Sequence, residues 1–534
     1  MMKNIFRVDF RRFAVKFFIF LALLIMPITL NAQEDREDIE ETAINESDSA
    51  FFESGFGFGD NSFGDSGGFG FSGGETLPST FSTGSGFSAP SIRIGGEATA
   101  EFTCFFDYFD SAQKLKSSRP ADVFSGSLNF EASGTASQAI INLNLTPVFD
   151  GSSSPVGIDE AYVRAFFGPV TVVGGLRKLT WGKADSFGPL DVVNPLDYSD
   201  LTKLTDPQSI KIARPMIHAS WAPGAFTKLE AVFVPWFQGH KFAKSGRWAP
   251  SQMTGLAPAM AGGFEDFILS NPVVLLVNPA LLNDLKVWQE NFDINNYFWD
   301  HNYTLEYAQV GMRITSTVNS SDFGVQYYFG SLPRPRVNVN LGNFFDGLSN
   351  LPPQLDVNKI SINVDYTYYH QFAIDFARVI LGYNIRAEAG MNITSDVFGT
   401  DGEIENPAFV WSLGFDRDLF WRINLNLQGA GKIRFAHIMI GNNFLEDCEA
   451  GTTLSSTRIT GKLSRKILRE EIELKTTALW GIEDRDFLIM PSFIWSRNDV
   501  STELSAGFFG GDKNGELGQY RDNAFMRMIL TYKF

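Results

Sequence analysis

Acidic side chains recur between positions 181 and 209, and basic side chains stand on both sides of this segment. The charged residues within the segment are Lys183, Asp185, Asp191, Asp197 and Asp200, and the flanking bases are Arg177, Lys178, Lys211 and Arg214. Opposite charges that face each other across a narrow, water-filled space select solutes by size and by electric field. These residues could therefore act as a filter, provided that the fold brings them to a constriction.

Residue patterns for catalysis are weak by comparison. Residues 64–68 read Gly-Asp-Ser-Gly-Gly, which matches the G-x-S-x-G pattern of serine hydrolases, but they lie in a repeat built of the same residue types. A nucleophilic serine also needs a positioned histidine base and an oxyanion hole, and the five histidines are scattered along the chain. No metal-binding cysteine or histidine motif and no nucleotide fingerprint occurs in the sequence. We predict no enzyme activity, no catalytic residue, no metal and no cofactor.

The first part of the chain is typical of an exported protein. Basic residues precede an apolar stretch over residues 17–30, and a small-residue cleavage site follows. This stretch is too short for a spanning helix, which needs about 20 apolar residues, so residues 1–32 are predicted to be a signal peptide. Residues 33–90 are first acidic and then rich in Phe, Gly and Ser, which predicts a disordered periplasmic tether. The alternative is a sticky segment that binds a partner or enters the lumen.

Apolar and polar residues alternate with a period of two from residue 91 onwards, most clearly over residues 471–480. The alternation predicts about 18 β-strands (16–18), one of them over residues 358–371. Tight connections such as 222–225 alternate with long ones such as 237–302. This alternation is typical of outer-membrane barrels, with turns in the periplasm and loops outside. We therefore predict an all-β fold, a transmembrane antiparallel up-and-down β-barrel, over residues 91–534.

The same alternation predicts which side chains line the lumen. In the strand expected over residues 377–390, it directs Arg378, Arg386 and Glu388 inward, if the apolar residues between them face lipid. The last expected strand alternates up to an aromatic final residue, Phe534, with Tyr532 two positions earlier. This ending looks like the signal that the barrel assembly machinery reads, so we expect that machinery to be a partner.

The charged segment resembles a stretch found in a porin-like family of bacterial outer-membrane proteins. The family pattern W-G-(E/K)…N-P-x-D matches Trp181-Gly182-Lys183 and Asn194-Pro195-Leu196-Asp197, and a strand of the I-K-x-x-x-P-M type follows over residues 210–216. The resemblance covers a small part of the chain and implies the class of protein rather than a substrate. General porins also fold the loop after their fifth strand into the lumen. By that analogy residues 181–209 would form a constriction; the alternative is a loop that caps the barrel from outside.

These expectations converge on an outer-membrane channel for the passive diffusion of small solutes. A first alternative is a transporter of hydrophobic molecules, gated by the apolar loop 237–302, although this loop could equally be a self-packed cap. A second alternative is a surface adhesin. The net charge of −17 argues against nucleic-acid partners. The solute, the ion selectivity, the oligomeric state and any pairing of Cys104 with Cys448 stay open, with free thiols favoured.

Overall fold

A computed structural model of the chain describes residues 91–106, 124–146, 154–270, 276, 278–293, 296–340, 356–437, 448–449 and 452–534. The predicted signal peptide, residues 1–32, and the predicted tether, residues 33–90, lie outside these described residues. No helix in the described part of the chain is long and apolar enough to cross a membrane.

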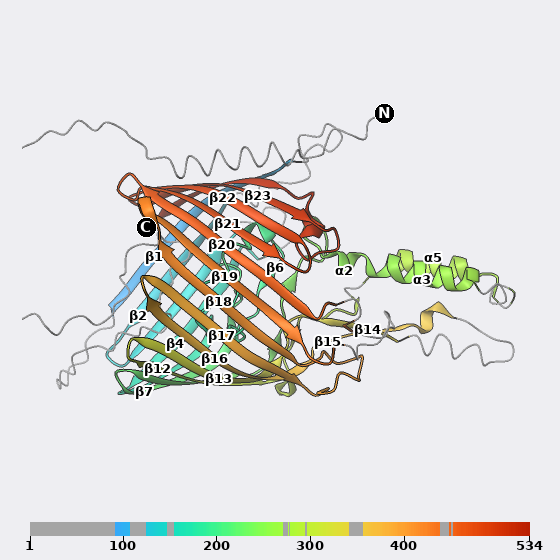
Figure 1. The fold of residues 1–534 in the computed structure, drawn as a ribbon, viewed down its shortest axis with the longest axis horizontal. Helices are drawn as coiled ribbons and strands as arrows, with labels where there is room; N and C mark the ends of the chain where they lie inside the picture. Colours follow the sequence, from blue (N-terminus) through green and yellow to red (C-terminus); the bar gives the residue numbers. More distant parts are fainter. Residues whose placement is uncertain are drawn as a thin grey trace, which may run out of the picture.

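Eighteen antiparallel strands form the wall of the molecule. In chain order they are β1 (Ser91–Phe105), β2 (Phe124–Ser133), β3 (Ser137–Leu145), β4 (Val156–Phe167), β5 (Val170–Arg177), β7 (Arg214–Gly224), β8 (Thr227–Val234), β12 (Gln309–Val318), β13 (Ser321–Ser331), β16 (Tyr368–Ile380), β17 (Tyr383–Thr394), β18 (Ala408–Asp418), β19 (Ile423–Arg434), β20 (Ser455–Ile467), β21 (Ile472–Gly481), β22 (Asp486–Arg497), β23 (Val500–Gly511) and β24 (Phe525–Lys533). Each strand pairs with the next, and β1 also pairs with β24, so the sheet closes on itself (Figure 1). The predicted all-β barrel of about 18 strands is confirmed.

The two faces of the wall differ in polarity. In β12, Met312 is 64% exposed and points outward, whereas the adjacent Arg313 is 4% exposed and points inward. The same period of two runs through the other strands, so that exposed isoleucines, phenylalanines and methionines cover the outside. A closed barrel leaves no strand edge unpaired, and an apolar outer face is what lipid requires.

Short turns join the strands at one end of the barrel. At the other end the connections are longer, except for the four residues 482–485 between β21 and β22. The turn between β12 and β13 places Asn319 and Ser320 at φ 49° and 61°, and that between β16 and β17 places Leu381 and Gly382 at φ 53° and 79°. Two successive residues with positive φ form the hairpin turn whose twist matches that of the strands. The C-terminus lies at the end with the short turns (Figure 1).

The barrel closes through a contact between the last residue and a glycine. The backbone of Phe534 exchanges two hydrogen bonds with Gly96 of β1, both 3.0 Å long. A Cβ atom at position 96 would lie 2.8 Å from the Phe534 ring and 2.4 Å from the carbonyl oxygen of Ser127. Only glycine fits this close approach. Tyr532 and Phe534 are both exposed on the outer face, and their role as an assembly signal stays a prediction.

One predicted strand is wrong in position. Residues 358–371 were expected to cross the membrane, but the strand at this point is β16, which begins at Tyr368. The alternating residues before it form β15 (Ser361–Asp365), which pairs with β14 (Arg336–Asn340) outside the wall. Alternation marks a strand with one polar face, whether that strand lies in a membrane or in a loop.

Residues that precede and follow β12 and β13 build a small separate core. The helices α3 (Leu256–Ser270) and α5 (Leu281–Asn291) pack against β14 and β15 through buried side chains such as Phe264, Leu281 and Ile362. These helices project from the long-loop end of the barrel (Figure 1). Much of the apolar part of loop 237–302 is therefore packed within this projecting unit.

Candidate functional site

The segment between β5 and β7, residues 178–213, lies inside the barrel, and we call it the interior loop. It contains the short strand β6 (Asp197–Tyr198) and a single-turn helix over Leu201–Lys203. Its residues contact Gly311 of β12 and inward-facing side chains of β13, β16, β17, β19 and β24. These wall strands lie between Gln309 and Lys533, far from the loop in sequence. They meet the loop because the sheet closes into a barrel around it.

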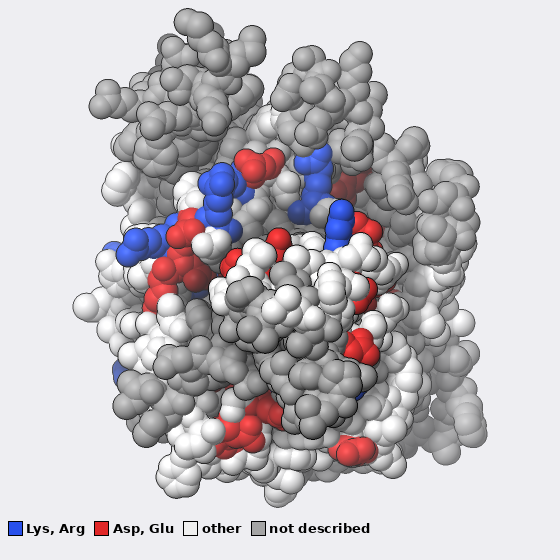
Figure 2. All heavy atoms as spheres, turned by 90° about the vertical axis from the view of Figure 1, so that its right-hand side faces the viewer, with Lys and Arg blue, Asp and Glu red and all other residues white. Residues whose placement is uncertain are grey.

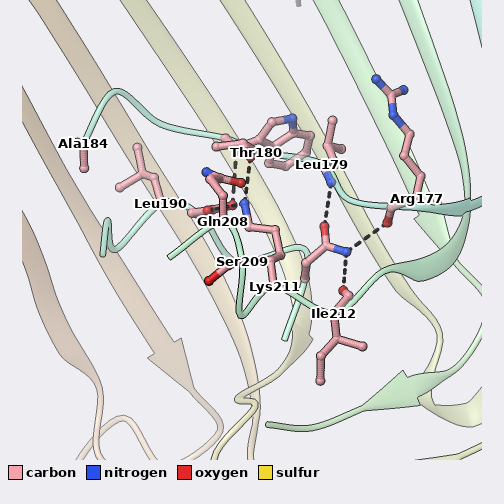
Figure 3. Close-up of polar contacts among 12 residues, drawn as sticks. Arg177, Leu179, Thr180, Ala184, Leu190, Gln208, Ser209, Lys211 and Ile212 are labelled. Atoms are coloured by element: carbon pink, nitrogen blue, oxygen red, sulfur yellow. Dashed lines mark hydrogen bonds and ion pairs between the residues drawn. The ribbon is translucent and has the colours of Figure 1, made fainter. Parts of the chain in front are cut away.

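Asn194 joins the two ends of the interior loop. Its Oδ1 atom accepts a hydrogen bond from the N–H of Leu179 at 2.8 Å, and its Nδ2 donates to the carbonyl oxygens of Arg177 and Ile212 at 3.0 and 2.8 Å (Figure 3). The side chain is 4% exposed. A buried amide with this many bonds fixes the base of the loop, which is the role that the asparagine of the N-P-x-D stretch takes here.

Glu388 of β17 holds the tip of the loop. Its Oε1 atom accepts hydrogen bonds from the backbone N–H groups of Lys183 and of Ala184, the second at 2.8 Å. Gly182 and Gly188 lie on either side of this carboxylate, and a Cβ atom at position 182 would lie 2.3 Å from Oε1. Gly182 also has φ +95°, which side chains disfavour. The glycine of the W-G-K stretch therefore lets the backbone approach the wall.

Three glutamines of the wall bind the rest of the loop tip. Gln428 of β19 accepts hydrogen bonds from the N–H groups of residues 185–186, at 2.8 and 3.0 Å. Gln371 of β16 and Gln326 of β13 donate to the carbonyl oxygens of residues 189–190, both at 3.0 Å. Irregular backbone inside a barrel must find hydrogen-bond partners. Sequence reasoning missed these glutamines; uncharged amides at inward positions of apolar strands were the available signal.

Trp181 is seated in a gap on the inner wall. A Cβ atom at Gly311 of β12 would lie 2.6 Å from Cη2 of the indole ring. The ring is 2% exposed and packs in a cluster with Val193, Met216 and Tyr328. The absence of a side chain at position 311 therefore makes room for the tryptophan of the loop.

We expect Gly311→Val to destabilise the folded barrel by roughly 1–3 kcal/mol, because the added methyl groups overlap the Trp181 ring. The measurement is the free energy of unfolding by denaturant in detergent, followed by tryptophan fluorescence. Gly174→Val is the matched control, since a Cβ atom at position 174 meets nothing within 4 Å. Equal stability of the two variants would contradict the seat assigned to Trp181.

Asp185 reaches across to the wall and forms an ion pair with Arg386 of β17. The same guanidinium lies 3.0 Å from Oδ1 of Asp416 of β18. Asn426 of β19 donates a further hydrogen bond to Asp185 at 2.7 Å. The predicted loop acid Asp185 and the predicted wall residue Arg386 are thus brought together, although sequence reasoning had assigned Asp185 to other bases.

Each of the other predicted charges of the loop has a nearby ion partner: Lys183 with Asp322 at 3.5 Å, Asp191 with Lys211 at 2.6 Å, Asp197 with Lys241 at 2.8 Å, and Asp200 with Lys203 at 3.7 Å. Of these four pairs, one joins an expected loop acid to an expected wall base, that of Asp191 with Lys211. The loop charges are therefore mostly balanced close to where they lie.

The remaining predicted wall bases bind elsewhere. Arg177 lies 3.1 Å from Nδ1 of His218, Lys178 pairs with Asp159 at 2.7 Å, and Arg214 donates to the carbonyl oxygens of Val193 and Trp236 at 3.1 and 2.7 Å. The expectation that these three bases oppose the loop acids is wrong, because each is taken up near the base of the loop.

Arg378 does not line the lumen, and this prediction is also wrong. It lies in β16 opposite Ile385, on the same face as Ile374, which is 59% exposed. The register predicted from sequence began the neighbouring strand six residues too early. The turn at Leu381 and Gly382 separates Arg378 from Arg386, so the period of two does not run through both.

The inner face of the wall is covered on one side and uncovered on another. Where the interior loop packs, the inward side chains of β7, β12, β13 and β16 are buried: Arg214, Met216, His218, Ser220, Gln309, Arg313, Gln326, Tyr328, Tyr369, Gln371 and Asp375. On β2, β3 and β4 the inward side chains keep solvent contact: Ser127, Asn129, Glu131, Gln138, Asn142, Glu160, Tyr162 and Arg164. Within the described residues, the loop therefore lies off centre.

Apolar side chains pack on the inner wall beside β21 to β24. Leu201, Leu204 and Ile210 of the loop pack with Trp248 and with inward side chains of these strands. Nδ1 of His240 accepts a hydrogen bond from the N–H of Leu196 in the loop at 2.9 Å. Burial lowers the pKa of His240 to about 3, so the imidazole stays neutral. In the described residues, no cluster of His, Cys, Asp or Glu could hold a metal ion.

Comparison with known proteins gives a likeness in architecture. No family model and no curated protein matches the chain. Among solved structures, OccK11 (OpdR) of Pseudomonas aeruginosa matches with 7% identity and a TM-score of 0.43, over 83% of this chain and 95% of that one. Wzi of Escherichia coli, an outer-membrane, carbohydrate-binding β-barrel involved in group 1 capsule assembly, matches with 12% identity and a TM-score of 0.40, over 83% and 84%. Likeness at this level concerns the barrel alone.

Proposed function

We propose that this chain is an outer-membrane channel for the passive diffusion of small polar solutes, narrowed by the interior loop. One observation carries the proposal: inward side chains are partly exposed along β2, β3 and β4, which we call the exposed strip, whereas they are buried where the loop packs. A water-filled passage would run along the exposed strip. The apolar outer face and the closed sheet support a membrane setting for such a passage.

The exposed strip is chemically mixed, which suits small polar solutes rather than one charge type. Gln138 donates to Glu131 at 2.8 Å, and Asn142 donates to Glu160 at 3.3 Å. Amides and paired charges can exchange hydrogen bonds with a solute that sheds part of its water. Because the ions of the loop are largely paired, the loop would act by occupying space more than by its electric field.

The proposed setting follows from the same features. Export through the signal peptide of residues 1–32 would deliver the chain to the periplasm. The barrel assembly machinery would then read the end of β24, with Phe534 placed against Gly96, and insert the barrel into outer-membrane lipid.

Thiol labelling tests the position of the passage. In a background with Cys104 and Cys448 replaced by Ser, Asn129→Cys on β2 should react rapidly with a charged, membrane-impermeant reagent, and the reaction should reduce the conductance of a planar bilayer. Ser220→Cys on β7 is the matched control, since Ser220 also points inward but is only 6% exposed. Equal labelling of both sites, or an absence of conductance, would contradict the proposal.

A surface adhesin is the second candidate, and one observation favours it. The helices α3 and α5 project beyond the long-loop end, with Leu269 and Val287 57% and 48% exposed (Figure 1). Specific binding of the protein to cells, lost on removal of residues 252–292 and without any bilayer conductance, would favour this function.

The gated transporter of hydrophobic molecules gains no such support. The apolar side chains of loop 237–302 that the structure describes pack mainly among themselves and on the barrel interior.

A further inference from the structure

Two arginines and one glutamate from separate segments meet at the long-loop end of the barrel. Arg334 follows β13, Arg458 lies in β20, and Glu516 lies between β23 and β24. Nη2 of Arg334 is 2.5 Å from Oε1 of Glu516, and Nη2 of Arg458 is 2.5 Å from Oε2. Each oxygen of one carboxylate thus has its own guanidinium, which is a strong, charge-assisted arrangement.

This group is partly exposed to solvent. The side chains of Arg334, Glu516 and Arg458 are 56%, 38% and 24% exposed. Figure 2 shows this end of the molecule, where basic and acidic side chains lie next to each other on the surface. A solute that arrives from the long-loop side can therefore reach the guanidinium groups.

The loop that carries Glu516 is held in place without its carboxylate. Asp486 accepts hydrogen bonds from the N–H groups of Leu517 and Gly518, at 2.5 and 3.1 Å. Gln519 donates to the carbonyl oxygen of Glu516 at 2.9 Å. The side chain of Glu516 could therefore turn away while its backbone stays in position.

The backbone at the two arginines is also held independently of Glu516. Arg458 belongs to a strand of the wall. Beside Arg334, the N–H of Leu332 donates to the carbonyl oxygen of Thr367 at 2.8 Å, and the N–H of His240 donates to that of Pro333 at 2.7 Å. A site whose backbone is in place before binding loses less entropy when an anion binds than a site whose backbone must first become ordered.

Charge holds the group together. Burial by itself would raise the pKa of Glu516, but the charges of Arg334 and Arg458 outweigh it and keep this pKa below its ordinary range. Without Glu516, the two guanidinium groups would repel each other, and an external anion would relieve that repulsion.

We propose that Arg334 and Arg458 form a binding site for small solutes that carry a carboxylate, and that Glu516 occupies this site until a solute displaces it. The planar carboxylate of Glu516 marks the shape that the site accepts, with one oxygen for each guanidinium. The site lies at the long-loop end of the barrel. Any part that it has in transport rests on the proposed function, whereas binding itself does not.

Binding of succinate to the purified, full-length protein in detergent tests the proposal, with isothermal titration calorimetry as the measurement. Wild type should bind weakly, because Glu516 competes. Glu516→Gln should bind at least tenfold more tightly, and the double variant Glu516→Gln, Arg458→Gln should lose this gain. Glu483→Gln, a change to another loop carboxylate, should leave binding at the wild-type level.

The other outcomes are equally decisive. Succinamide, the neutral analogue, should not bind to Glu516→Gln; equal binding of succinate and succinamide overturns the proposal. Inorganic phosphate should bind more weakly than succinate, and tighter phosphate binding would overturn the assignment to carboxylates. If Glu516→Gln fails to fold, Arg458→Gln alone should abolish the weak binding of wild type, and unchanged binding would contradict the site.

Conductance separates this proposal from the function of the protein. If the protein conducts but its Glu516→Gln variant binds no succinate, the carboxylate site is wrong and the proposed channel function stands. If the protein binds succinate as described but does not conduct in a bilayer, the carboxylate site stands and the proposed channel function is wrong.

Discussion

Excision of residues 183–189 should raise the single-channel conductance by roughly twofold, because it takes the tip of the interior loop out of the lumen. The design follows from the shape of the loop. The N–H of Trp181 donates to Asp191 at 3.4 Å, and a Cβ atom at Gly182 would lie 3.2 Å from that of Leu190. Gly182 can therefore be joined directly to Leu190 without moving the base of the loop.

The control for this excision is the removal of residues 252–292, which takes away the helices that project from the barrel. That deletion should leave the single-channel conductance near the wild-type value, since α3 and α5 pack against β14 and β15 in a core outside the barrel wall. Conductance that stays the same after excision of 183–189, or that changes equally in both deletions, would show that the loop tip does not limit passage.

Asp375→Asn should destabilise the barrel by about 3–5 kcal/mol, because it leaves the guanidinium of Arg313 buried without its counter-charge. Nη2 of Arg313 lies 2.7 Å from Oδ2 of Asp375, and the two side chains are 5% and 0% exposed. The pair lies on the inner wall beneath the loop, between β12 and β16. The measurement is the free energy of unfolding by denaturant in detergent micelles.

Asp200→Asn is the matched control for Asp375→Asn. Asp200 pairs with Lys203 at 3.7 Å, and the two side chains are 40% and 47% exposed. An exposed pair of this kind contributes about 0–1 kcal/mol. The double change Arg313→Met, Asp375→Leu should recover most of the stability lost in Asp375→Asn; a double variant as unstable as the single one would point to a role other than charge balance.

The barrel could be predicted from the sequence because its two strongest patterns are local. The alternation over residues 471–480 identifies a strand without knowledge of any contact. The change between tight and long connections indicates on which side of the membrane each strand begins. The failure at 358–371 has the same origin. A loop hairpin with one polar face, such as β14 with β15, shows the alternation of a membrane strand, and a shift by a few residues moved Arg378 to the wrong face.

The partners of the interior loop could not be predicted in this way. Asp185 binds Arg386 and Glu388 binds Lys183 from positions about 200 residues apart in sequence. Charge complementarity predicts that an acid will pair with a base, but it does not identify the base. Arg177 and Lys178, two bases close to the loop in sequence, contact His218 and Asp159. The glutamines were missed because an amide in a strand has no preferred partner until the opposite wall is known.

The seating of the interior loop has a consequence for how the protein folds. Thr202 accepts a hydrogen bond from Arg527, which lies 325 residues later in the chain. Contacts of such high sequence separation form slowly, because a long stretch of chain must lose its freedom before they are made. The contacts between the loop and β24 therefore form only when β24 pairs with its neighbours. The pairing of β24 with β1 that closes the barrel also encloses the loop. Folding of this protein should end in one slow, cooperative step, in which the barrel closes and the interior loop packs inside it.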